Sequence, residues 1–157
     1  MFRVVSHSHV GNGSPVETVV LAHDERHLRR KVLSLASGMQ IMLDFPEPVS
    51  LSDGDFLILE DGRQVRVIAA EEELYAVTPR DRLHLCELAW HLGNRHLPAQ
   101  IEEARIVIQR DRIIRSMLEG LGASVAEISG PFHPMRGAYH GEHSHSHSNR
   151  SEDHHEH

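Results

Sequence analysis

The chain has 157 residues, of which 39% are hydrophobic and 25% charged, values typical of a globular protein with one medium core or two small ones. Its formal net charge of -7 disfavours a nucleic-acid partner, because the phosphate backbone would be repelled. A single cysteine excludes an intrachain disulfide, and no signal core or membrane-spanning run is evident, so we expect a cytoplasmic protein with no membrane partner. The 15 histidines and the negative charge suit metal ions instead.

Short β-branched or alternating segments separated by turns fill the first half of the chain. Strands are predicted at VETVVLA, KVLSLA, QIMLD, FLILE and QVRVIA. In the last of these, Val65, Val67 and Ala69 fall on one face, as expected of a half-buried strand. The pattern predicts a small, mostly antiparallel β domain over residues 1–72, with one solvated side.

A basic cluster interrupts these strands. It consists of four residues within ERHLRRK: Arg26, Arg29, Arg30 and Lys31. We interpret it as a solvated turn with flanking charges, and a contact with a partner is the alternative.

A different pattern follows Glu72. LYAVT predicts a strand, and DRLHLCELAWHL predicts a helix that Gly93 would end as a left-handed C-terminal residue. QIEEARIVIQ predicts two short strands, RDRIIRSMLEGLG a second helix and ASVAEIS a final strand. The order β-α-β-β-α-β is the ferredoxin-like plan, which we assign to residues 73–132. The whole chain is therefore expected to be α+β.

Residue spacing indicates which helical faces are buried. On the first helix, His84, Glu87 and His91 form a polar stripe, which we interpret as solvated, with metal binding as the alternative. Cys86 lies among apolar residues and is expected to be a core thiol. The second helix turns two i, i+4 pairs toward the core: Ile113 with Met117, and Ile114 with Leu118.

The C-terminal segment has no hydrophobic periodicity. Residues 133–157 are predicted to be a disordered His-rich tail, because they cannot bury enough surface to offset the entropy of ordering. The histidines are interrupted by other residues, unlike a contiguous purification tag, so we expect the tail to be native. Its imidazoles suit nickel, zinc and copper. The candidate metal ligands in the tail are His140, His143, His145, His147, His154, His155 and His157.

Four histidines in the β half are expected to have simpler roles. His7 and His9 form an H-S-H pair that we place in a surface loop, with a weak accessory metal site as the alternative. His23 and His27 are expected to be exposed.

The segment AWHLGNRHLPAQI at 89–101 resembles the signature of urease accessory proteins of the UreE type, which are nickel metallochaperones. GNRH followed by Pro is the specific part of this likeness. The similarity extends to TVVLAHDERHLRRKVL, SGMQIMLDFP and LSDGDFLILEDGRQVRVIAAEE in the first half, and to PFHPMRGAY with the His-rich end.

The resemblance implies an N-terminal domain like the peptide-binding domain of heat-shock cochaperones and a ferredoxin-like domain through which two chains form a homodimer. The histidine of GNRH, here His96, would bind Ni2+ at the dimer interface. The implied partners are the urease apoprotein and its accessory GTPase complex. Some members carry His-x-His where this chain has Arg110 and Arg112 around Asp111, so no site is carried over there. Met135 likewise replaces an acidic residue often found before the tail.

We therefore predict a nickel metallochaperone in which paired His96 residues share one ion and tail histidines complete its coordination. Zn2+ or Cu2+ could bind the same ligands. The alternative is a cytoplasmic nickel or zinc store in which the tail does most of the binding. An enzyme is not predicted, since the sequence contains no H-E-x-x-H motif, phosphate-binding glycine loop or nucleophile elbow. A metal-dependent hydrolase remains the third hypothesis.

Overall fold

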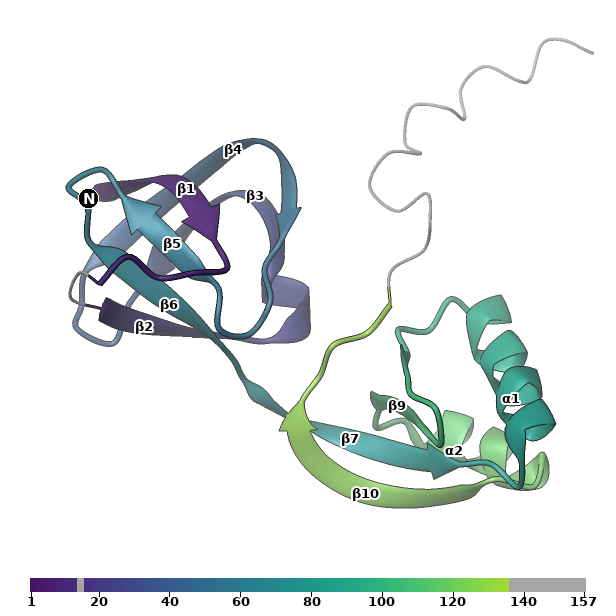
Figure 1. The fold of residues 1–157 in the computed structure, drawn as a ribbon. Coiled ribbons are helices and arrows are strands. Elements are labelled where there is room, and N and C mark those ends of the chain that lie inside the picture. The colour runs from purple at the N-terminus through teal and green to yellow at the C-terminus, as the bar shows by residue number, and fades with distance from the viewer. Residues whose placement is uncertain (14–15, 136–157) are drawn as a thin grey trace, which may run out of the picture.

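Two β-sheets of different topology organise the chain (Figure 1). The structure is a computed structural model, and it describes residues 1–13 and 16–135. Strands predominate in the described residues and two α-helices accompany them, which confirms the predicted α+β class. The predicted tail lies outside the described residues from position 136 onward. Its first three residues, 133–135, are ordered and not disordered as expected, because the backbone N–H groups of His133 and Met135 donate to Gln100 and Ala99.

The first sheet has six strands in the order β2-β6-β5-β1-β4-β3. The pairs β1/β4 and β2/β6 are parallel, while the other three neighbouring pairs are antiparallel, as the mostly antiparallel prediction requires. A short 3-10 helix, η1 (His23–Glu25), connects β2 to β3. The strands are β1 (Phe2–Ser8), β2 (Val16–Leu21), β3 (His27–Ser34), β4 (Gln40–Ser50), β5 (Phe56–Leu59) and β6 (Gln64–Ala69).

Alternation along these strands builds the first core. In β6, Val65, Val67 and Ala69 are buried, which confirms the predicted inward face. The same alternation places Gln64 on the outer face, but Gln64 is also buried, and its side-chain oxygen accepts a hydrogen bond from the backbone N–H of Asn12 at 3.0 Å. The loop after β1 therefore covers this end of the sheet.

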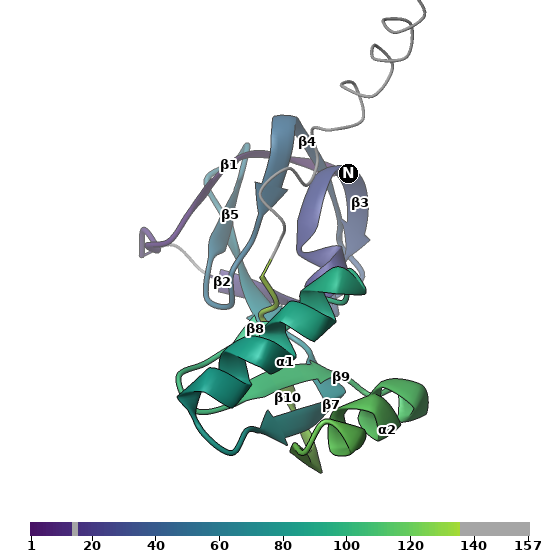
Figure 2. The same ribbon diagram turned by 90° about the vertical axis from the view of Figure 1, so that its right-hand side faces the viewer.

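The second sheet has four antiparallel strands in the order β10-β7-β9-β8. The elements follow one another as β-α-β-β-α-β, as predicted, and both helices lie on one face of the sheet (Figure 2). They are β7 (Glu71–Thr78), α1 (Arg82–Asn94), β8 (Gln100–Ile101), β9 (Ile106–Gln109), α2 (Arg112–Gly120) and β10 (Ser124–Pro131).

Each helix begins at an aspartate that caps it. The Asp81 side chain accepts a hydrogen bond from the backbone N–H of His84, and Asp111 accepts from Ile113 and Ile114. The helices then bury their leucines against alternate residues of β7 and β9. The buried side chains of this core include Leu85, Leu88, Leu92 and Leu118 from the helices and Tyr75, Val77, Ile106 and Ile108 from the sheet.

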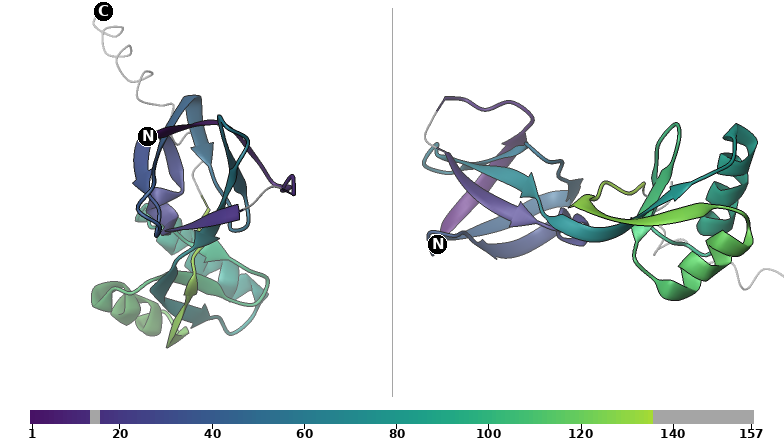
Figure 3. Two further views of the ribbon diagram at one scale, coloured as in Figure 1. Left: turned by 90° about the vertical axis from the view of Figure 1, so that its left-hand side faces the viewer. Right: turned by 90° about the horizontal axis from the view of Figure 1, so that it is seen from below.

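The chain passes from β6 directly into β7, so the two sheets are joined end to end (Figure 3). After β10 it returns across the sheet face opposite the helices. Phe132 is fully buried there with Leu74 of β7 and Val107 of β9. The backbone N–H of Met135 then donates to the carbonyl of Ala99 at 2.9 Å. The C-terminal segment thus ends beside the loop that follows α1.

Several expectations about the fold are wrong. The sequence patterns missed β1, so His7 lies in a strand and not in a loop. The basic cluster is not a solvated turn, because β3 begins at His27 and Arg26 is buried. Ile113 was expected in the core but is 79% exposed, and Cys86 is also exposed, since α1 and α2 turn other residues toward the sheet.

Among the described helices, none combines the length and the apolar character that crossing a membrane requires.

Candidate metal site

His96 lies just beyond the end of α1, in a turn that fixes its backbone. Its N–H donates to the carbonyl of Gly93 at 3.0 Å, and the N–H of Leu97 donates to the carbonyl of Leu92 at 3.2 Å. This pair of bonds is the Schellman motif, in which one residue takes the left-handed conformation. That residue is His96, with φ of 56°. The prediction for Gly93 is therefore wrong, because Gly93 lies within α1.

Helix α2 ends in the same pattern. The N–H of Gly122 donates to the carbonyl of Glu119, and the N–H of Ala123 donates to that of Leu118, both at 3.0 Å. Here the left-handed residue is a glycine, with φ of 95°. Glycine adopts this conformation without steric penalty. The turn after α1 achieves the same geometry with a histidine.

The backbone of His96 is strained while its side chain faces solvent. Among the described residues it is the only one other than glycine with positive φ. A side chain in this conformation costs about 1 kcal/mol relative to glycine. The residue is exposed, and its imidazole has no hydrogen-bond partner in residues 1–13 and 16–135. Leu97 packs against the core beneath it, so the imidazole projects from a fixed point and both ring nitrogens remain accessible to a metal ion.

The loop beside His96 is held by charged groups. The Gln100 side chain donates to Glu102 at 2.6 Å, and Arg105 donates to the same carboxylate at 2.8 Å. The hydrogen bond from Arg105 lowers the pKa of Glu102 more than burial raises it. Glu102 therefore stays ionised and fixes Gln100, which in turn accepts a hydrogen bond from the backbone N–H of His133 at 2.8 Å.

His84, at the other end of α1, is a structural residue. It was expected on a solvated stripe, but it is only 3% exposed. Its Nδ1 accepts a hydrogen bond from the backbone N–H of Arg80 at 2.9 Å, so its Nε2 carries the proton and donates to the carbonyl of Leu121 at 2.8 Å. Both nitrogens are engaged, and His84 joins the start of α1 to the end of α2. It is unavailable to a metal ion.

Two histidines expected to be exposed are half-buried instead. His23 Nδ1 lies 2.9 Å from a carboxylate oxygen of Glu72, and its ring meets that of Phe132 edge-on at 5.0 Å. His27 Nδ1 lies 2.8 Å from the hydroxyl of Ser50 on the neighbouring strand. These contacts hold η1 and β3 in place. The spacing of histidines along the sequence does not indicate them, because the partners are distant in the chain.

The two histidines of the H-S-H pair near the N-terminus contact different residues. The ring of His7 meets that of Phe45 edge-on at 5.4 Å, and His9 Nδ1 lies 2.6 Å from the buried carboxylate of Asp55. A carboxylate only accepts hydrogen bonds, so Nδ1 of His9 is the donor. Each histidine thus has its own neighbour.

The seven tail histidines predicted as ligands all lie outside the described residues. Within residues 1–13 and 16–135, no three His, Cys, Asp or Glu side chains are grouped closely enough to hold a metal ion. Arg110, which stands where some relatives of the UreE type were expected to carry histidine, donates to the carbonyls of Leu74 and Ile128 and so ties β7 to β10.

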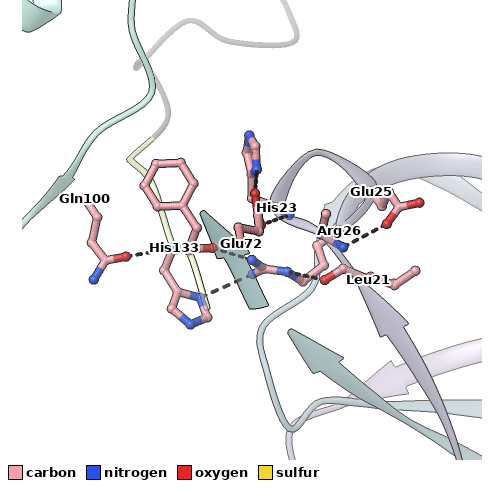
Figure 4. Close-up of polar contacts among 9 residues, drawn as sticks. Leu21, His23, Glu25, Arg26, Glu72, Gln100 and His133 are labelled. Atoms are coloured by element: carbon pink, nitrogen blue, oxygen red, sulfur yellow. Dashed lines mark hydrogen bonds and ion pairs between the residues drawn. The ribbon is translucent and has the colours of Figure 1, made fainter. Parts of the chain in front are cut away.

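Sequence reasoning missed one cluster entirely, at the junction of the two sheets (Figure 4). The guanidinium of Arg26 donates to the carbonyls of Leu21 and Phe132 and to Nδ1 of His133. Arg26 lies between η1 and β3 of the first sheet and is 5% exposed, whereas Phe132 and His133 follow β10. No local pattern predicts a contact between residues more than a hundred positions apart.

Comparison with known proteins identifies the family. Residues 4–70 match the N-terminal domain of the UreE urease accessory proteins, and residues 72–157 match the C-terminal domain. The chain is 58% identical over 149 residues to the urease accessory protein UreE of Rhizobium rhizogenes, covering 94% of this chain and 89% of the relative. It is 62% identical over 128 residues to the UreE of Sinorhizobium fredii, covering 82% and 80%. These matches confirm the resemblance seen at residues 89–101, and the chain belongs to the UreE family of urease accessory proteins.

Proposed function

We propose that the protein is a nickel metallochaperone, which binds Ni2+ in the cytoplasm and delivers it for assembly of the urease metallocentre. It acts as an accessory protein and not as an enzyme. The observation that carries the proposal is His96: an exposed imidazole at a strained backbone position that glycine would occupy at lower energy. Strain of this kind persists where a side chain is needed for a role other than folding.

A single imidazole fills one of the four to six positions that nickel requires, so the remaining ligands come from elsewhere. We propose that a second copy supplies one of them in a homodimer. The outward face of α1 supports this, because Leu83 and Trp90 are 68% and 65% exposed and Cys86 lies between them. A groove of about 390 Å³ beside Trp90 adds to this apolar surface. A two-fold axis near the end of α1 would bring both His96 imidazoles to one ion.

The tail histidines are proposed to complete the coordination. The backbone N–H of Met135 donates a hydrogen bond to the carbonyl of Ala99, which lies three residues after His96. His140 follows Met135 by five residues, a stretch that can span at most about 17 Å. His140, the first of the seven candidate ligands in the tail, is therefore within reach of His96 in the same chain. Such an exchangeable site suits a carrier that releases its cargo, and Zn2+ or Cu2+ could also occupy it.

We divide the chain into a β domain over residues 1–72, a ferredoxin-like metal-binding domain over residues 73–132 and a tail over residues 133–157. The second sheet's strand order and its two helices on one face support the ferredoxin-like assignment. The β domain is proposed to dock with the urease apoprotein and its accessory GTPase complex.

A calorimetric nickel titration tests the proposal in two full-length variants. His96→Ala removes the fixed ligand, and a second variant replaces the seven tail histidines from His140 onward by serine. We expect a tight site at one ion per two chains, lost with His96→Ala and weakened but retained without the tail histidines. If the tail variant alone abolishes tight binding, the protein is a nickel or zinc store, and delivery from His96 is refuted.

A further inference from the structure

We infer that Arg95, the residue before His96, is a specificity-determining residue for nickel release, because its guanidinium is placed to receive a carboxylate of the acceptor that takes the ion. This inference rests on the proposed function and deepens it. It gives the chemical class of the acceptor, a polypeptide segment that brings carboxylates to His96.

The backbone holds Arg95 at the end of α1. Its N–H donates to the carbonyl of Leu92 at 3.1 Å, and the turn that fixes His96 follows at once. The Cα atoms of the two residues are about 3.8 Å apart, as in any adjacent pair. A guanidinium on one and a nickel ion on the other are close enough for their charges to interact, since the Debye length is about 10 Å at 0.1 M salt.

The side chain of Arg95 is anchored by an uncharged partner. Its Nε donates to the sulfur of Met117 on α2 at 2.9 Å, and Met117 packs against the core of the second sheet. A thioether is a weak acceptor without charge, so it fixes the side chain and leaves the positive charge unbalanced. By contrast, Arg115 on α2 is balanced by the carboxylate of Glu119 at 3.1 Å.

Two nitrogens of the Arg95 guanidinium remain available. Among the described residues, Nη1 and Nη2 have no hydrogen-bond or carboxylate partner, and the residue is exposed. Their N–H groups form a planar fork that matches the two oxygens of a carboxylate. A segment that places a carboxylate on this fork brings its other donor atoms beside His96.

A cation next to His96 favours release of nickel over storage. Like charges repel, so Arg95 weakens the retention of Ni2+, whereas it attracts anionic ligands. In the exchange, an oxygen of an ionised carboxylate supplies an electron pair to Ni2+ as the imidazole nitrogen of His96 withdraws its own. Nickel stays divalent, and neither an oxidant nor a proton donor is needed.

Extraction of nickel, followed by stopped-flow absorbance, tests the inference with the full chain loaded at one Ni2+ per two chains. The acceptors are nitrilotriacetate, a tricarboxylate, and terpyridine, a neutral ligand that binds through nitrogen. In Arg95→Gln, extraction by nitrilotriacetate should be roughly three- to tenfold slower, and extraction by terpyridine should change less than about twofold. Raising the salt to about 0.5 M should remove most of the difference, because it screens the guanidinium.

Two further variants control for charge and geometry. Arg30→Gln removes the same charge from an exposed arginine of β3, and it should leave both rates within about twofold of the unmodified chain. Arg95→Lys keeps the charge without the planar fork, so it should recover only part of the rate with nitrilotriacetate.

A matched pair of peptides tests whether the acceptor is a polypeptide. Both contain two histidines, which are flanked by aspartates in one peptide and by asparagines in the other. Arg95→Gln should slow nickel transfer to the aspartate peptide roughly threefold or more and leave transfer to the asparagine peptide within about twofold. Slowing with nitrilotriacetate alone would contradict a polypeptide acceptor.

Equal slowing with both chelators, or no slowing with either, would overturn the inference. A shift of Arg95→Gln from dimer to monomer in sedimentation would also overturn it, because the guanidinium would then pair with a second copy. Each of these results leaves the proposed function intact as long as His96→Ala still removes the tight site. If His96→Ala has no effect, the proposed function itself fails.

Discussion

The two helices of the second sheet end with the same hydrogen bonds but with different residues in the left-handed position. Gly122 fills that position after α2, and His96 fills it after α1. In both turns the next residue, Ala123 or Leu97, continues into the core. Because glycine makes this turn at lower energy, the histidine is not required for folding. Under the proposed function, Gly122 serves the backbone of its turn, whereas His96 is kept for its side chain.

The two ends of α1 show the same contrast between histidines. His84 at the start is buried with both ring nitrogens bonded inside the protein, while His96 at the end is exposed without an internal partner in the described part of the chain. They lie twelve residues apart in the printed sequence. A count of histidines treats them alike, but their environments differ: His84 has a structural role, whereas His96 is exposed, as the proposed metal site requires.

The largest expected effect on folding comes from His84→Ala. It leaves the N–H of Arg80 and the carbonyl of Leu121 without a partner and opens a cavity between the helices, so the free energy of unfolding should fall by about 2–4 kcal/mol. Urea denaturation measures this change. Arg30→Gln on β3, which removes only a surface ion pair with Asp44, is the control and should stay within about 0.5 kcal/mol. A small effect of His84→Ala would contradict the structural role.

Acid should weaken nickel binding, because protons compete with the metal for imidazole nitrogens. A free imidazole has a pKa of about 6.5, so affinity should fall as pH drops through about 6, by up to tenfold per pH unit for each proton that must be displaced. Nickel titrations at pH 7.5 and 5.5 measure the change. The same affinity at both values would rule out imidazoles as the principal ligands.

Gly122→Ala should lower the free energy of unfolding by about 1 kcal/mol, since alanine is strained at positive φ. The new Cβ would lie 3.3 Å from Nε of Arg80, which belongs to a flexible side chain, so the backbone strain dominates. Thermal or urea unfolding gives the value. A neutral result would mean that the left-handed turn tolerates side chains freely, and the argument for strain at His96 would then fail.

Gly93→Ala should have the smallest effect and the opposite sign. Gly93 lies inside α1 with no positive φ, and a Cβ there would meet no atom within 4 Å. Alanine should therefore stabilise the helix by about 0.5–1 kcal/mol. Loss of stability in a denaturation curve would instead indicate that Gly93 forms the turn.

Much of this fold could be predicted from the sequence. The alternation in β6 and the β-α-β-β-α-β order follow from local periodicity, which reports which face of an element is buried. The left-handed residue was misplaced because GNRH contains a glycine, the usual residue in that position. The helix continues two residues past its expected end, and only the hydrogen bonds of His96 and Leu97 reveal it.

The candidate site was only partly accessible to sequence reasoning. His96 was found through the likeness of its motif to a family, whereas its strain is visible only in the backbone. The burial of His84 and the contacts of Arg26 depend on elements far apart in the sequence, α1 with α2 and η1 with the segment after β10. Such contacts leave no periodic signal, so a buried arginine was read as part of a solvated turn.

The most direct test of the account is a nickel titration of His96→Gly. Glycine suits the left-handed turn better than histidine, so this variant should be more stable by about 1 kcal/mol, and a loss of binding cannot be attributed to a damaged loop. We predict that the tight site at one ion per two chains disappears while the free energy of unfolding rises. Tight nickel binding that persists in His96→Gly would contradict the claim that histidine occupies this strained position because its imidazole binds the metal.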